Sequence, residues 1–109
     1  MDNQLDTFFA AMADPTRRAV IERLAQGPAS VTDLHDPSAM ALPSFLKHVN
    51  RLESAGLIRS EKTGRTRILN IEAAPLAQAE DWLGRQRRLW EGKLDRLQAL
   101  AEAMERRKL

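Results

Sequence analysis

The 109-residue chain has no cysteine. It also lacks any apolar run of about 18 residues, the length that a membrane-spanning helix needs. Without cysteine the chain can form neither disulfides nor thiolate metal sites, and it has no thiol nucleophile. No segment resembles a signal peptide, which would need a short apolar centre. We therefore expect a cytoplasmic protein with no membrane partner.

Groups for catalysis or metal binding are also scarce. The sequence contains no Ser-His-Asp arrangement of suitable spacing and no glycine-rich phosphate loop. Glu80 and Asp81 are neighbours on a predicted helix, so their carboxylates point apart and cannot share a reaction. His35 and His48 are too distant in sequence to indicate a metal site by themselves. We expect no enzyme activity, no cofactor and no bound metal.

The charge that is present is unevenly placed. The whole chain has a net charge of +2, but residues 1–41 carry −3, residues 42–70 carry +4 and residues 71–109 carry +1. A positive middle third suits a polyanion such as nucleic acid, although such residues can also form an ordinary solvated face. The length suits one domain, here residues 1–109, since domains of about 100–150 residues are the commonest.

Capping and stop signals divide the first half of the chain into four helices. Asp14 precedes Pro15, a residue suited to the first turn of a helix, and Gly27-Pro28 ends that helix. Ser30 is a second capping residue, and Gly56 is typical of the position after a helix C-terminus. The predicted helices cover residues 5–13, 15–26, 31–34 and 42–55.

The second half predicts a hairpin and one long helix. Residues 57–62 and 65–71 have strand character, with Thr63-Gly64 as a two-residue turn. From Ala73 onward apolar residues recur every three or four positions, which indicates a helix to the end of the chain. Three helices followed by a β-hairpin describe a winged helix-turn-helix, a mainly α fold with a small β-hairpin. Its predicted parts are the helix-turn-helix (30–56), the wing (57–71) and added dimerisation helices (1–13 and 73–109).

The helix over residues 42–55 is strongly two-sided. Leu42, Phe45, Val49, Leu52 and Gly56 fall in one sector of a helical wheel, which we expect to face the core. The opposite side is polar and suits the major groove, where Arg and Lys donate to guanine and Asn can pair with adenine. The candidate DNA-reading residues are Ser44, Leu46, Lys47, His48, Asn50 and Arg51. For His48, a packed or hydrogen-bonded structural role is the alternative.

The hairpin carries a second basic group. Its cations, at positions 59, 62, 65 and 67, could follow the DNA backbone or enter a narrow minor groove. The simpler alternative is that Arg65 and Arg67 are outward residues of a half-exposed hairpin. The candidate wing residues are Arg59, Lys62, Arg65 and Arg67.

Large apolar residues on the two end helices need something to cover them. A dimer seam is the favoured interpretation, and a ligand pocket is the alternative. In a two-fold dimer, two recognition helices would lie about one DNA turn (~34 Å) apart. The candidate interface residues are Phe8, Phe9, Met12, Trp82, Leu83, Trp90, Leu94 and Leu97.

Longer stretches resemble a known family. ADPTRRAVIERL, VTDL and SFLKHVNRLESAGLIRSEKTGRTRIL are similar to the ArsR family of bacterial transcriptional regulators, over roughly residues 8–100. WLGRQRRLWEGKLDRL resembles the C-terminal helix of a branch without metal-binding cysteines. The resemblance implies a homodimer that binds double-stranded DNA at a palindromic operator and represses its own operon.

The sequence departs from the family at three places. Ser30 and Thr32 stand where metal-sensing members have cysteines, and the last helix lacks the histidine of another family metal site. Leu46 replaces a common serine, so it could pack or touch a thymine methyl but not donate a hydrogen bond. The effector is not indicated. A winged-helix module that docks proteins without binding DNA is the alternative function, although its surface should be more apolar than residues 42–70.

Overall fold

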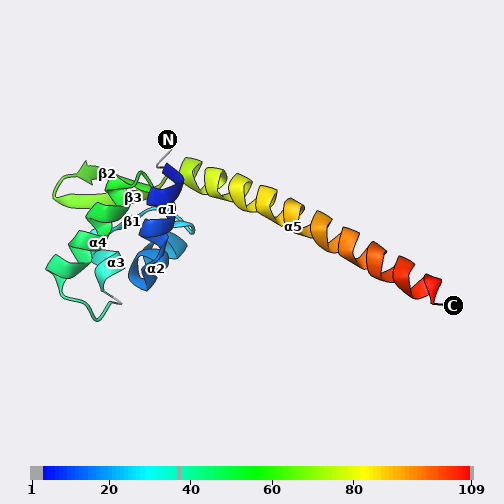
Figure 1. Ribbon diagram of the computed structural model, residues 1–109. Helices are drawn as coiled ribbons and strands as arrows, with labels where there is room; N and C mark the ends of the chain where they lie inside the picture. The colour runs from blue at the N-terminus through cyan, green and yellow to red at the C-terminus, as the bar shows by residue number, and fades with distance from the viewer. Residues whose placement is uncertain (1–3, 37, 109) are drawn as a thin grey trace. The chain divides into compact units, whose positions relative to one another are not determined.

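The computed structural model describes residues 4–36 and 38–108. The chain forms two compact units, Met1–Gln78 and Ala79–Leu109. Figure 1 shows four short helices and a small sheet in the first unit, and a long helix that begins there and continues through the second. The elements are α1 (Gln4–Met12), α2 (Pro15–Leu24), β1 (Ala29–Ser30), α3 (Val31–His35), α4 (Leu42–Ser54), β2 (Ile58–Thr63), β3 (Thr66–Ile71) and α5 (Ala74–Arg107).

The described elements form a winged helix-turn-helix, which confirms the predicted fold class. Helices α3 and α4 form the helix-turn-helix, and strands β2 and β3 form the wing. Residues 1–3 and 109 of the predicted end helices lie outside the described residues. Among the described residues, no helix is both long and apolar enough to cross a membrane.

The predicted helix caps are confirmed. The Asp14 carboxylate accepts hydrogen bonds from the backbone N–H groups of Thr16 (2.8 Å) and Arg17 (3.2 Å) at the start of α2. Burial alone would raise the pKa of Asp14, but the two N–H groups and the nearby Arg17 guanidinium lower it. Ser30 accepts from the N–H of Asp33 and so caps α3. Gly56 follows α4 with a φ of +77°, a left-handed conformation that glycine adopts without strain.

The sheet contains one strand more than the sequence predicted. Its order is β1-β3-β2, with both pairings antiparallel. Strand β1 has only two residues, Ala29 and Ser30, which pair with Leu69 and Ile68. Ser30 therefore belongs to the sheet through its backbone while its side chain caps α3. This contact fixes the start of the helix-turn-helix against the wing.

The predicted hairpin turn is wrong by one residue. Thr63 pairs with Thr66, so the turn is Gly64-Arg65 and not Thr63-Gly64. Gly64 has a φ of +63° at the first central position, as a type II′ turn requires. A type I′ turn over Thr63-Gly64 would put a β-branched residue at positive φ, which is sterically costly.

The core of the first unit lies where α4 meets the hairpin. Phe45, Val49 and Leu52 of α4 are at most 1% exposed, and they are among the largest fully buried side chains. Ile58 and Leu69 of the hairpin are buried with them. Two members of the predicted apolar sector do not join this core. Leu42, the first residue of α4, is 45% exposed, and Gly56 lies beyond the end of the helix.

Candidate nucleic-acid interface

Helix α4 has an apolar side, two flanks that meet other elements, and an exposed polar surface. Its apolar side is buried in the core. On one flank, Arg51 and Ser54 line a small pocket with Thr7 and Ala10 of α1. On the other flank, Asn50 contacts a residue of the wing. Ser44 and Lys47 also lie on the polar side of α4, and both are exposed. The first turn of α4 has no side-chain cap, so backbone N–H groups there remain available to an anion.

Four predicted DNA-contacting cations have no partner within the described part of the chain. The side chains of Lys47 and Arg51 of α4 make no hydrogen bond or ion pair there, and neither do those of Lys62 and Arg65 of the hairpin. All four side chains are exposed. An unpaired, exposed cation can bind a phosphate or a base edge without giving up an existing interaction. These four residues therefore form the part of the basic surface that is ready for a polyanion.

Arg67 is differently placed, because it already binds two elements of the protein. Its Nη2 donates to Glu53 Oε1 (2.6 Å) and to Asn50 Oδ1 (3.2 Å) on α4. Its Nε donates to the hydroxyl of Ser60 (3.0 Å), which in turn donates to Glu53 Oε1 (2.7 Å). The Ser60 hydroxyl, and then the Arg67 guanidinium, hold the pKa of Glu53 below its ordinary value against the effect of partial burial.

Arg59 is also occupied. It forms ion pairs with Glu72 and Glu61, and these carboxylates raise the pKa of the Arg59 guanidinium. Because Arg59 pairs with Asn70 in the sheet, it lies on the face opposite to Ser60 and Arg67. We do not count Arg59 or Arg67 among the groups that are free to meet DNA, although both were predicted to contact it.

His48 lies in a network between α4 and α2. Its Nδ1 is 2.9 Å from Nη1 of Arg17, which is a buried residue. A guanidinium can only donate, so Nδ1 must accept and the neutral ring carries its proton on Nε2. Arg17 also donates to the carbonyl oxygens of Ala11 (2.7 Å) and Ala10 (3.3 Å) of α1. The network ties three helices together and favours the structural role of His48.

Leu46 and His35, two residues singled out from the sequence, are both in contact with the rest of the protein. Leu46 is half-buried. His35 Nε2 lies 2.7 Å from the carbonyl oxygen of Met40, and the ring packs against Phe45. Within residues 4–36 and 38–108 there is no cluster of three or more potential metal ligands.

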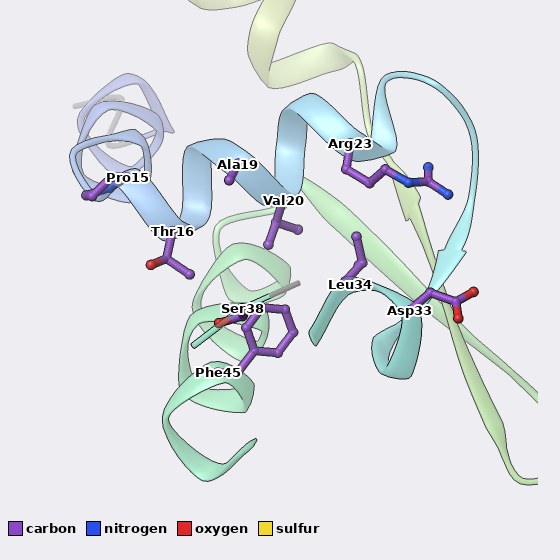
Figure 2. A pocket seen from close by; sticks show the side chains of 9 residues that line it. All are labelled: Pro15, Thr16, Ala19, Val20, Arg23, Asp33, Leu34, Ser38 and Phe45. Atoms are coloured by element: carbon purple, nitrogen blue, oxygen red, sulfur yellow. The ribbon is translucent and has the colours of Figure 1, made fainter. Parts of the chain in front are cut away.

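A pocket of about 450 Å³ lies among α2, α3 and α4. Figure 2 shows Val20, Leu34 and Phe45, one from each helix, pointing toward a common space. Arg23 and Asp33 also line it. This volume falls within the range of small-molecule sites, which are usually apolar with a few polar groups. The pocket touches the helix-turn-helix but contains none of the unpaired cations.

The predicted dimer residues divide between buried and exposed. Phe8 of α1 is buried and contacts Phe9 edge to face, with 5.5 Å between ring centroids. Met12 and Trp82 are half-buried. The rest of the set on α5 is more than half exposed in the single chain: Leu83, Trp90, Leu94 and Leu97.

Sequence reasoning missed Arg17, Glu53 and Ser60 as members of the site. None of the three follows from local periodicity. Arg17 reaches a residue 31 positions away, and Arg67 reaches Glu53 across 14 positions. The one sequence signal for such a network was the pair of opposite charges at 53 and 67 on elements expected to pack together.

Comparisons with known proteins agree with this geometry. Residues 12–61 match a family model described as a helix-turn-helix domain. The HTH-type transcriptional regulator Rv2034 of Mycobacterium tuberculosis is 35% identical over 72 residues, which are 66% of this chain and 67% of that protein. The transcriptional repressor SdpR of Bacillus subtilis is 25% identical over 79 residues, 72% of this chain and 88% of that protein.

A solved structure is more similar still. The crystal structure of an ArsR family transcriptional regulator has 53% sequence identity and a TM-score of 0.78 to this chain. The match covers 82% of this chain and 92% of the other. It therefore includes both the helix-turn-helix and the wing.

Proposed function

The chain belongs to the ArsR family of transcriptional regulators, which are not enzymes, and from this premise we propose that it is a homodimeric repressor that binds a palindromic operator. The observation that carries the proposal is the set of unpaired cations on α4 and the hairpin. They lie on the helix-turn-helix and the wing, the two parts of such a fold that reach DNA.

We propose different parts for these residues. Ser44 and Lys47 lie on the exposed polar side of α4, and Asn50 lies exposed on its wing flank, so these three residues would read base edges in the major groove. Lys62 and Arg65 are at or beside the hairpin turn, so they would contact phosphates or the minor groove. Arg51, on the α1 flank of the helix, would contact either a base or the adjacent backbone. Leu46 and His48 would border this surface.

A second copy of the chain would cover the exposed apolar side of α5. Five large residues recur at intervals of seven along this helix, and each is more than half exposed. A seven-residue repeat keeps side chains on one side of a helix and is typical of helix pairs that pack along their length. The repeat consists of Leu76, Leu83, Trp90, Leu97 and Met104.

Repression is the direction supported by similarity to SdpR, which is a transcriptional repressor. A dimer related by a two-fold axis presents two copies of α4, so its operator should have matching half-sites. Binding at the protein's own promoter would then block transcription of its operon.

The first test is a gel shift with the DNA upstream of the protein's own gene and a shuffled duplex of the same composition. We expect the wild type to shift the upstream DNA at concentrations that leave the shuffled duplex free. Lys47→Ala should weaken this shift, and Lys108→Ala, which changes an exposed lysine at the end of the chain, should not. No shift of either duplex at low salt would favour the protein-docking alternative.

A further inference from the structure

Four polar side chains meet where the wing packs on α4. Ser60 and Arg67 come from the hairpin, and Asn50 and Glu53 come from the helix. In the sheet Ser60 pairs with Leu69, so Ser60 and Arg67 lie on the face that also carries this core residue. The register of the hairpin therefore aims the Arg67 guanidinium at α4 and away from the free face of the wing.

The Arg67 guanidinium is bound on more than one edge. Nε donates to Ser60, and Nη2 donates to both Glu53 and Asn50. The contact with Glu53 is an ion pair of 2.6 Å between side chains that are each about one-third exposed. To bind a phosphate, Arg67 would have to leave a carboxylate that already neutralises its charge. Lys62, its direct neighbour across the hairpin, has no such partner in the described chain.

The same contact fixes the orientation of Asn50. A side-chain amide can present either its oxygen or its nitrogen to a given neighbour, but a guanidinium can only donate. Arg67 therefore requires the Asn50 oxygen to point toward the wing, and the amide NH₂ group points away from it. An asparagine that pairs with adenine must use both its oxygen and its NH₂ group on the base. Asn50 has its oxygen engaged and its donors free.

We propose that Arg67, held by Glu53, is a positioning residue that sets Asn50 as a hydrogen-bond donor toward DNA and does not itself contact DNA. The inference rests on the proposed function. Guanine presents two acceptors, O6 and N7, in the major groove, whereas cytosine presents a donor. Asn50 in this orientation favours guanine at the base that it reads. Without Arg67 the amide can turn over, and adenine becomes an equally good partner.

The test is selection from a library of random-sequence duplexes, carried out with the full-length wild type and with variants. Asn50→Ala identifies the position that Asn50 reads, because only that preference disappears from the selected sequences. At this position Arg67→Met should lose about fivefold to a hundredfold of the preference for guanine over adenine, the range expected for one base contact. Its affinity should keep the same dependence on salt, since no phosphate contact is removed.

Three further variants separate positioning from charge. Arg67→Lys keeps the charge, but its single ammonium nitrogen cannot replace both Nε on Ser60 and Nη2 on Glu53 and Asn50, so it should behave like Arg67→Met. Lys62→Met is the matched control for a free cation. It should keep every base preference, bind all duplexes more weakly and reduce the salt slope by about one. Glu53→Gln should shift the base preference at the position that Asn50 reads in the same direction as Arg67→Met. If Arg67→Met does not fold, Glu53→Gln replaces it as the test.

Other results would overturn the inference. If Arg67→Met lowers the salt slope by about one with unchanged base preferences, and Arg67→Lys restores binding, Arg67 is a phosphate contact. If Arg67→Met and Glu53→Gln both select the same sequences as the wild type with the same salt slope, the network does not set specificity. A wild type that enriches no sequence at all overturns the proposed function, and the inference with it.

Discussion

At the scale of single residues, the basic side chains differ in what they already bind. Lys47, Arg51, Lys62 and Arg65 are unpaired within the described residues, while Arg17, Arg59 and Arg67 are engaged with carboxylates, carbonyls or a histidine. The net charge of a stretch of sequence does not distinguish the unpaired cations from the engaged ones. Only the free ones can add to DNA affinity without an offsetting loss inside the protein.

The Glu53 carboxylate gives a pH-dependent prediction. Its pKa is lower in the folded protein than in the unfolded chain, so it stabilises the fold above the ordinary glutamate pKa of about 4.3. That contribution is lost as the pH falls through the lowered folded pKa. Wild type should therefore have a higher Tm than Glu53→Gln at pH 7, and the difference should shrink below about pH 4.

The measurement is thermal unfolding of both proteins from pH 7 to pH 3. Glu105→Gln is the matched control, because Glu105 is exposed on α5 and is not part of this network. A difference between wild type and Glu53→Gln that stays constant over this pH range would contradict the assigned role of the carboxylate.

At the scale of elements, Arg17 is the main polar tie between α1, α2 and α4. Arg17→Met keeps much of the apolar stem but leaves the carbonyl oxygen of Ala11 and the His48 ring without their donor. Leaving buried polar groups unsatisfied costs about 1–3 kcal/mol, so urea unfolding should show a loss of about this size. Arg85→Met, at an exposed position on α5, should change stability by less than about 0.5 kcal/mol. Equal losses in the two variants would contradict this account.

The helices were predictable because their signals are local. Asp14-Pro15, Ser30 and Gly56 each act within a few residues, through a cap or a backbone conformation. Strand β1 was missed because its two residues become a strand only by pairing with β3, some 40 positions later. Such pairing leaves no periodic signal in two residues.

The hairpin turn and the polar network show a second limit. The predicted and observed registers both place Ile58 and Leu69 on the core face, so apolar alternation could not distinguish them. The steric cost of a positive φ at Thr63 decides between them. The helix and the hairpin that carry the predicted site residues follow from the sequence, but the bonding partners of these residues depend on contacts between elements. Periodicity therefore identified the basic surface without revealing that Arg67 faces inward.

At the scale of the whole molecule, α5 provides the apolar surface for a second copy. Leu97→Glu places a charge within the seven-residue repeat and should dissociate the dimer. Light scattering should give about twice the 12.3 kDa chain mass for the wild type and about one chain mass for the variant. Ala99→Glu adds the same charge two residues away, on a different side of the helix, and should remain dimeric. A wild type of one chain mass would contradict the proposed dimer.

The most direct test of sequence-specific DNA recognition is a pair of anisotropy titrations over a range of salt concentrations. One uses the duplex that the wild type selects, and the other uses a shuffled duplex of the same length and composition. The proposed function predicts that the selected duplex binds about a thousandfold more tightly or better at physiological salt. It also predicts that both affinities fall as salt increases. Equal affinity for the two duplexes would contradict the claim that α4 reads sequence.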